Sequence, residues 1–449
     1  RTVAWWKMIA ERYKDQPAVA GYDLLNEGFS VPRYEDLVSL YDRLYKEIRK
    51  IDTRHIVIME DVWGFHHLPR PEVMGWENVV YSFHYYPRGL KSIEEAIEVD
   101  ATVLHRFNRT ALYDGVPIYV GEFSPIDARS GGADSFLKYR EACEYFHWAW
   151  TFWTYKKIEE NDNIVWAPYG YYATRPLPKI ATDSFEKIKT DFEAMATANS
   201  TPHPLIPAAL TAPIRWEPEP APADGSIALS LRKACVVAGE NGYLRYEWGW
   251  TPPNVGYWTK GDSMGWKIEV AKDGVFEIGF LLANNSDDNR AGVWVDGVLA
   301  GVYPLRNTRG WRSFQDVGLG RIGLTAGKHT IELTQEDDVK GFANFRGGWL
   351  KPVEGEPLPA DERRVRLTPF GMADLPKESP IRVEWLNNPP NFGSWNAGQA
   401  VSWDLRLTQG GAYAASAMYA TANEGAAFEL TLDGKPVLAK PSPSTGDWQ

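Results

Sequence analysis

The feature that most constrains the fold is a short apolar stretch that ends in a carboxylate. Residues 118–121 predict a buried strand, and Glu122 stands at its carboxyl end. An earlier apolar stretch, residues 19–25, is followed in the same way by Glu27. Acidic residues at the carboxyl ends of strands, in a chain that alternates strands and helices, are typical of a two-carboxylate hydrolase site.

Residues 1 to about 200 repeat strand and helix patterns with short connections. The predicted strands are 19–25, 55–59, 79–84, 118–121 and 149–153, and the predicted helices are 34–50, a short one near Pro71, 93–112, 135–145 and 183–196. Apolar strands in repeated strand–helix units predict a parallel sheet covered by helices. A (β/α)8 barrel takes about 250 residues. We therefore expect a partial TIM barrel, five of eight strands, with the other three upstream of Arg1.

Composition excludes several classes of function. The 449 residues carry a net charge of -11 with no run of Lys and Arg, which argues against nucleic-acid and membrane partners. The two cysteines, Cys143 and Cys235, fall in different predicted domains, so no disulfide is expected. The 20 Trp and 22 Tyr are suited to stacking on sugars, but they could equally fill cores. Without a signal peptide or an initiator Met, the sequence is expected to begin inside a longer protein.

Polar and aromatic residues collect at the predicted strand ends. They are Asn26, Glu27, Asp61, His84, Tyr86, Glu122 and Trp153. Four motifs contain most of them: 25–27 (Leu-Asn-Glu), 83–86 (Phe-His-Tyr-Tyr), 120–123 (Val-Gly-Glu-Phe) and 150–156 (Trp-Thr-Phe-Trp-Thr-Tyr-Lys). In this order and spacing they resemble the second half of a glycoside hydrolase family 5 catalytic barrel.

The resemblance implies a retaining glycosidase, in which one carboxyl group protonates the leaving oxygen while the other attacks the anomeric carbon. Glu27 would be the acid/base and Glu122 the nucleophile. The implied supporting roles are Tyr86 as a donor to Glu122, His84 beside the pair, Asn26 on the sugar 2-hydroxyl and Trp153 as the floor of the subsite. No metal and no cofactor is expected for catalysis. Asp61 and Trp63, which follow a strand end, are further candidates for lining the cleft.

A proline-rich segment and an internal repeat follow. The proline density of residues 201–225 predicts a semi-rigid extended linker without helix or central strand. Residues 245–258 then match residues 382–395 at an offset of 137, which also carries Trp266 onto Trp403. Short alternating strands with Asp-Gly turns predict two antiparallel, jelly-roll-like β-sandwich modules, 226–355 and 362–449, the second of them truncated.

Each repeat is similar to carbohydrate-binding modules of families 6 and 35. The matching segments are 256–262, 295–297, 308–311, 324–331 and 342–344. The resemblance suggests Trp258, Trp311 and Asn344 as glycan contacts, although both rings recur in the repeat and could serve the fold instead. It also suggests a structural calcium ion on Glu247 and Asp262. Trp266 and Trp403 alternate with apolar residues and are expected in the core.

These patterns together predict a secreted or periplasmic, monomeric glycosidase with appended binding modules. The substrate would be a β-linked polysaccharide of the cellulose, β-glucan or mannan type. In a first alternative the partial barrel is inert and the chain is a carbohydrate-binding protein. In a second, the sandwiches are spacers that bind nothing.

Overall fold

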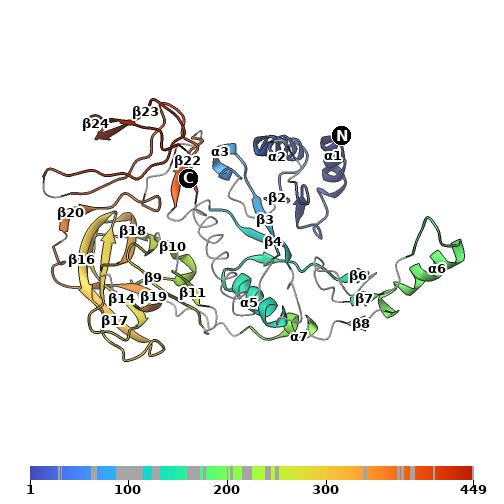
Figure 1. Ribbon diagram of the computed structural model, residues 1–449, viewed down its shortest axis with the longest axis horizontal. Coiled ribbons are helices and arrows are strands. Elements are labelled where there is room, and N and C mark those ends of the chain that lie inside the picture. Colours follow the sequence, from blue (N-terminus) through green and yellow to red (C-terminus); the bar gives the residue numbers. More distant parts are fainter. Residues whose placement is uncertain are drawn as a thin grey trace. The chain divides into compact units, whose positions relative to one another are not determined.

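The computed structural model forms two compact units, residues 1–406 and 407–449 (Figure 1). It describes residues 1–28, 31, 33–61, 68–86, 115–123, 132–158, 172–174, 178–199, 201–202, 206–214, 225–237, 244–247, 252–336, 341–359, 361–371, 375, 379–384, 390–407 and 410–446. The predicted helix 93–112 and the cleft candidate Trp63 lie outside these ranges. No helix in the described part is long and apolar enough to cross a membrane.

The first region is a half-barrel, as predicted. Five parallel strands lie in the order β1-β2-β3-β4-β5. They are β1 (Gly21–Asp23), β2 (Ile56–Glu60), β3 (Val79–Tyr85), β4 (Ile118–Phe123) and β5 (Ala149–Trp150). The accompanying helices are α1 (Thr2–Tyr13), α2 (Tyr34–Arg49), α3 (Pro71–Met74) and α5 (Gly132–Tyr145). Tyr41, Leu44 and Ile48 on α2 are fully buried, because their helical spacing places them on one face.

Asp52 fastens the connection between α2 and β2. Its side chain is 2% exposed and accepts hydrogen bonds from the Tyr22 hydroxyl at 2.6 Å and from the backbone N–H groups of Arg54 and His55 at 2.8 and 3.1 Å. Burial by itself raises the pKa of this carboxyl group, but the hydrogen bonds outweigh it and lower the pKa to about 2. The ionised carboxylate therefore stabilises the contact between β1 and the segment that connects α2 to β2.

The proline-rich segment is partly helical, so the prediction of an extended linker is wrong for residues 206–211. These residues form α7 (Ile206–Thr211), with Pro207 in its first turn, where a missing N–H group is tolerated. The guanidinium group of Arg140, buried on α5, donates to the backbone oxygens of Ala209, Leu210 and Ala212 at the end of α7. Before it lie β6 (Lys156–Ile158), β7 (Tyr172–Thr174), α6 (Phe185–Ala194), η3 (Thr197–Asn199) and β8 (Thr201–Pro202).

The first repeat is the predicted antiparallel sandwich. One sheet has the order β10-β13-β18-β15-β16-β20, and the other has β11-β12-β19-β14-β17 with β9 beside β19. The elements are β9 (Ile227–Leu229), η4 (Leu231–Lys233), β10 (Cys235–Val237), β11 (Arg245–Glu247), β12 (Asn254–Gly256), β13 (Ser263–Val270), β14 (Gly274–Ala283), β15 (Arg290–Val295), β16 (Val298–Pro304), β17 (Gln315–Leu324), β18 (Gly327–Gln335), β19 (Asn344–Val353) and β20 (Asp361–Val365).

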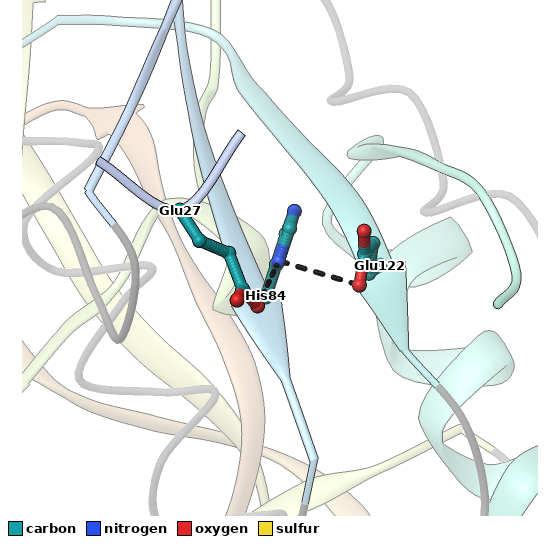
Figure 2. A group of neighbouring side chains, drawn as sticks. All are labelled: Glu27, His84 and Glu122. Carbon is teal, nitrogen blue, oxygen red and sulfur yellow. Dashed lines mark hydrogen bonds and ion pairs between the residues drawn. The ribbon is translucent and has the colours of Figure 1, made fainter. Parts of the chain in front are cut away.

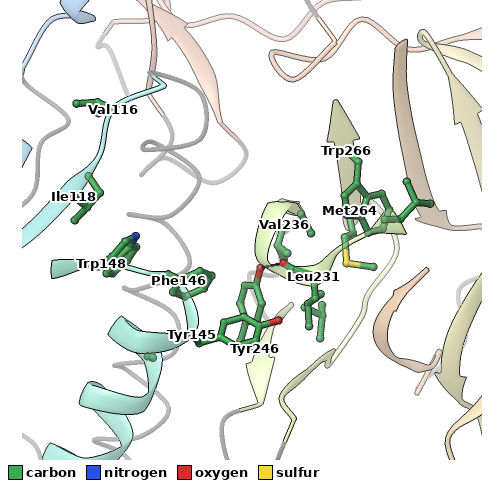
Figure 3. Packing of buried hydrophobic residues seen from close by; sticks show 14 of the residues in the cluster. Val116, Ile118, Tyr145, Phe146, Trp148, Leu231, Val236, Tyr246, Met264 and Trp266 are labelled. Atoms are coloured by element: carbon green, nitrogen blue, oxygen red, sulfur yellow. Dashed lines mark hydrogen bonds between the residues drawn. The ribbon is translucent and has the colours of Figure 1, made fainter. Parts of the chain in front are cut away.

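Aromatic side chains build the core of this sandwich and join it to α5. Trp266 is 1% exposed, as predicted, and its Nε1 donates to the Ser230 backbone oxygen at 2.8 Å. Figure 3 shows Phe146 beside Tyr246 of β11, and their ring centroids are 5.5 Å apart. The hydrophobic core is therefore continuous from the half-barrel into the first sandwich.

Trp258 belongs to this core, which corrects its expected place at a glycan-binding surface. Its side chain is 3% exposed and packs edge-on against Phe342 and Phe345, with centroids 5.3 Å away in both cases. Trp311, by contrast, is 39% exposed. The first of the two rings serves the fold, and only the second is accessible to a ligand.

The second repeat reproduces local structure of the first. β21 (Arg382–Glu384) pairs with β22 (Asn391–Gly393) in the same register as β11 with β12. In the second unit, β23 (Ala426–Leu432) and β24 (Lys435–Ser442) form a hairpin around Asp433, whose φ of 49° equals that of Asp296 between β15 and β16. The 137-residue offset therefore carries backbone geometry as well as residue identity.

Replacing Asp52 by Ala should lower the free energy of unfolding by roughly 2–3 kcal/mol, since buried donors lose a charged acceptor. The folded-state pKa lies below the ordinary value, so this stabilisation is present above about pH 4 and is lost as pH falls towards 2. Guanidinium unfolding of the unmodified protein and of Asp52→Ala should show a difference in the free energy of unfolding that becomes smaller as pH falls from 4 to 2. Asp15→Ala, which removes an exposed partner of Arg54, is the control with a small effect; equal effects would contradict the assignment.

Replacing Trp258 by Ala should cost about 3–5 kcal/mol of stability, because it leaves a cavity between two buried phenylalanine rings. Trp311→Ala removes the same side chain from an exposed position and should change stability by about 0.5 kcal/mol or less. Thermal unfolding of the two variants measures the contrast. A Trp258→Ala protein as stable as Trp311→Ala would show that the ring is not a core residue.

Candidate active site

The carboxyl ends of β1 to β4 bring the predicted catalytic residues together. Glu27 lies in the turn after β1 with a φ of 48°, a left-handed conformation that non-glycine residues rarely adopt. Its backbone N–H donates to Glu60 Oε2, at the end of β2, at 3.0 Å. The turn is therefore tied to the neighbouring strand.

An irregularity between β3 and β4 aligns the other two groups. Phe83 pairs with Val120 and His84 pairs with Glu122, so Gly121 is the extra residue of a bulge. A Cβ atom at Gly121 would lie 2.9 Å from Ser82 Oγ and 3.2 Å from His84 Nε2. Glycine is needed there because the imidazole ring lies against the bulge.

His84 lies between the two glutamates (Figure 2). Its Nδ1 is 2.9 Å from Glu27 Oε1 and 3.4 Å from Glu122 Oε2, and the three ligand-type atoms lie within 4.8 Å of one another. The imidazole is 3% exposed, whereas the side chains of Glu27 and Glu122 are 31% and 14% exposed. The carboxylates thus reach an accessible surface while the histidine supports them from behind.

Tyr86 lies where the sequence predicted a donor to Glu122. It directly follows β3, and its hydroxyl donates to Glu122 Oε2 at 2.5 Å. Trp153 is 46% exposed, and its backbone N–H donates to the Phe123 oxygen at 3.0 Å, which keeps it at the same edge of the sheet. Asn26 is exposed in the turn beside Glu27. Sugar contacts by Asn26 and Trp153 stay predictions.

Glu60 belongs to this site although the sequence did not predict it there. It ends β2, is 1% exposed, and lies with Oε1 3.3 Å from His84 Nε2. Burial, together with the charges of Asp23, Glu27 and Glu122, raises its pKa to about 8 against the opposing hydrogen bond from Glu27 N–H. The available signal was an acidic residue closing an apolar strand, the pattern already seen at Glu27 and Glu122. Asp61, the residue singled out instead, is buried one position further along.

Two groups of residues are candidates for holding a metal ion. Glu27, His84 and Glu122 are the one trio of His, Cys or acidic side chains close enough to share an ion within the described ranges. Glu247 is hydrogen-bonded to Asn254, and Asp262 Oδ2 accepts from the Thr259 N–H at 2.6 Å. The calcium ion suggested for Glu247 and Asp262 stays a prediction.

A second candidate site lies on the first sandwich. Asn344 Nδ2 donates to the Trp311 backbone oxygen at 3.0 Å, and Asn344 Oδ1 would be 2.5 Å from a Cβ at Gly256. The next residue, Tyr257, is 52% exposed, and the guanidinium of Arg245 lies 3.9 Å over its ring. Of the two adjacent rings, Tyr257 is therefore the exposed one and Trp258 the buried one. Sequence alone could not tell which of two adjacent rings points outward.

Two family models match parts of the chain. Residues 1–159 match the cellulase family (glycosyl hydrolase family 5), and residues 234–348 and 381–449 match carbohydrate binding module family 6. A "Beta-xylosidase" of Phanerodontia chrysosporium is 27% identical over 183 residues, which are 35% of this chain and 38% of that protein. An "Endoglycoceramidase" of Hydra vulgaris is 29% identical over 180 residues, 35% of this chain and 32% of that protein.

Among solved structures, endoglucanase Cel5A from Thermotoga maritima is 22% identical with a TM-score of 0.32, over 43% of this chain and 65% of that one. The chain spans about a third of the length of the curated relatives it matches. The half-barrel is therefore similar to glycosyl hydrolase family 5, and the two repeats are similar to carbohydrate binding module family 6.

Proposed function

We propose that the chain carries the catalytic pair of a retaining O-glycosyl hydrolase. The observation that carries this is that carboxylate oxygens of Glu27 and Glu122 lie within 4.8 Å of each other at the carboxyl edge of a parallel sheet. Retaining enzymes hold their carboxyl groups about 5–5.5 Å apart, whereas inverting enzymes need about 6.5–9.5 Å to admit a water molecule. The spacing favours retention.

The contacts suggest how the two glutamates divide the work. Glu122, with one oxygen held by the Tyr86 hydroxyl, would attack the anomeric carbon as an ionised nucleophile. Glu27, the more exposed of the two, would give its proton to the departing glycosidic oxygen and then take a proton from the water that releases the sugar. A sugar ring stacked on the exposed indole of Trp153 would lie between the two glutamates.

We propose a β-linked polysaccharide of the cellulose, β-glucan or mannan type as the substrate. The names of the relatives differ, since they include a β-xylosidase, an endoglycoceramidase and an endoglucanase. Xylo-oligosaccharides and glycosylceramides therefore belong in the same test panel. The exposed Tyr257 and Trp311 would hold the chain on its polymer and raise the effective concentration of the catalytic site. We further propose that it works outside the cytoplasm as a monomer.

One observation favours a carbohydrate-binding protein as a second candidate. The described sheet has five strands with β1 at an edge, whereas a closed barrel of this family type has eight. If the chain acts without further strands, glycan binding through the modules would be its activity. The tests below separate the two functions.

Replacing Glu27 by Ala should lower kcat about 10²–10⁴-fold, the usual contribution of a general acid. Glu122→Ala should lose at least as much, and added azide should restore turnover with inversion of the anomeric centre. The assay measures the release of reducing sugar and the anomeric configuration of the product. Unchanged turnover in either variant would show that the wrong glutamate is assigned.

Replacing Trp311 or Tyr257 by Ala should weaken retention of the full chain on insoluble β-glycan, because stacking of an exposed ring on sugar is lost. Leu281→Ala, which trims another exposed apolar side chain of the same sandwich, should bind as the unmodified chain does. Glu122→Ala should also bind normally. Retention by both ring variants would move the binding site elsewhere or leave the modules as spacers.

A further inference from the structure

Glu60 contacts two parts of the candidate active site at once. Its Oε2 accepts the backbone N–H of Glu27, and its Oε1 lies beside the ring nitrogen of His84 that faces away from the catalytic carboxylates. We propose that Glu60 is a positioning residue which, as a neutral carboxylic acid, holds His84 as the neutral Nδ1–H tautomer. The proposal rests on the function proposed above and extends it.

The surroundings of Nδ1 decide where the imidazole proton lies. Nδ1 is 2.9 Å from one carboxylate and 3.4 Å from the other. An ionised carboxylate, such as the proposed nucleophile Glu122, can only accept hydrogen bonds, so a bare Nδ1 would turn its lone pair towards those of Glu122. Glu27 keeps an oxygen that can accept whether or not it carries the proton that it would donate. A protonated Nδ1 instead donates to Glu27 and attracts Glu122.

Nε2 and Glu60 Oε1, 3.3 Å apart, must then share one further proton. If the proton is on Nε2, the pair is an imidazolium with a carboxylate; if it is on Oε1, both groups are neutral. Glu60 is 1% exposed, and acidic neighbours face it from the ends of two strands, namely Asp23 and Glu27 at the end of β1 and Glu122 in β4. The Tyr41 hydroxyl from α2 donates to the Glu60 backbone oxygen at 2.8 Å. A further buried negative charge is disfavoured there.

The raised pKa of Glu60, about 8, agrees with the neutral pair. A buried acid that keeps its proton near neutral pH can donate to a bare imidazole nitrogen. The hydrogen-bond chain then runs from Glu60 O–H to Nε2, and from Nδ1–H to Glu27. Every member has the donor or acceptor that its neighbour requires.

The neutral state of His84 has a consequence for catalysis. An imidazolium 2.9 Å from Glu27 would stabilise the ionised carboxylate and so oppose its role as an acid. A neutral ring orients Glu27 without adding a positive charge beside it. Because Glu60 also holds the Glu27 backbone, one side chain fixes both the position and the electrostatic surroundings of the acid/base.

Two substitutions separate this role from a structural one. Glu60→Gln keeps the shape and offers an amide N–H to Nε2 and an amide oxygen to Glu27 N–H, so kcat should stay within about threefold of the unmodified protein. Glu60→Leu keeps the volume but provides neither contact, and it should lower kcat on the order of 10²-fold, the usual effect of a misplaced catalytic group. Glu47→Gln on the outside of α2 is the matched control. A Gln variant as impaired as the Leu variant would overturn the proposal.

The ring nitrogens of His84 give a test that needs no turnover. Nitrogen NMR of ¹⁵N-histidine-labelled chain, with the signal assigned by His84→Gln, should show a protonated Nδ1 and a bare Nε2 near neutral pH. As Glu60 loses its proton above about pH 8, Nε2 should lose its hydrogen-bond donor and its signal should shift, and Glu60→Gln should abolish this change. A cationic ring or a protonated Nε2 at neutral pH would refute the proposal. If the unmodified protein hydrolyses nothing, the catalytic assignment fails, while this spectrum still decides the state of His84.

Discussion

The site depends on the pairing of β3 with β4 around Gly121. Without the extra residue in β4, the alternation of side chains along a strand would send Glu122 to the opposite face from the imidazole. The bulge places His84 opposite Glu122 and leaves room for the ring, because Gly121 has no Cβ to meet it. The parallel pairing positions β3 and β4, and the bulge brings His84 and Glu122 to the same face at the carboxyl ends of these strands.

Much of this could be predicted from the sequence because parallel strands end at one edge of a sheet. Glu27, His84 and Glu122 each follow or close an apolar stretch, so their meeting required no knowledge of side-chain packing. Glu60 satisfies the same rule, but its role depends on burial and on the orientation of the imidazole, which periodicity does not encode. The helix α7 was not predicted for a different reason. High proline density argues against a helix, but Pro207 lies in the first turn, where a missing N–H group interrupts no hydrogen bond.

The repeat shows how the same sequence pattern can have different consequences. Trp258 and Trp395 occupy equivalent positions, and the indole N–H of each donates to the backbone oxygen three residues before it. Trp258 is buried under Phe342 and Phe345, whereas Trp395 is 48% exposed. Local hydrogen bonds are thus set by the motif itself, while burial is set by residues almost ninety positions away.

Charge sets the limit on what the catalytic edge can hold. Glu27, Glu60 and Glu122 surround one imidazole that is 3% exposed, and a single ring cannot neutralise three carboxylates. The most deeply buried of them, Glu60, carries the greatest desolvation cost and therefore keeps its proton most readily. Glu122 is 14% exposed and accepts a hydrogen bond from the Tyr86 hydroxyl, whereas Glu27 is 31% exposed and lies beside the His84 ring. Burial therefore sets Glu60 apart, while the contacts of Glu122 and Glu27 distinguish the nucleophile from the acid/base that we propose.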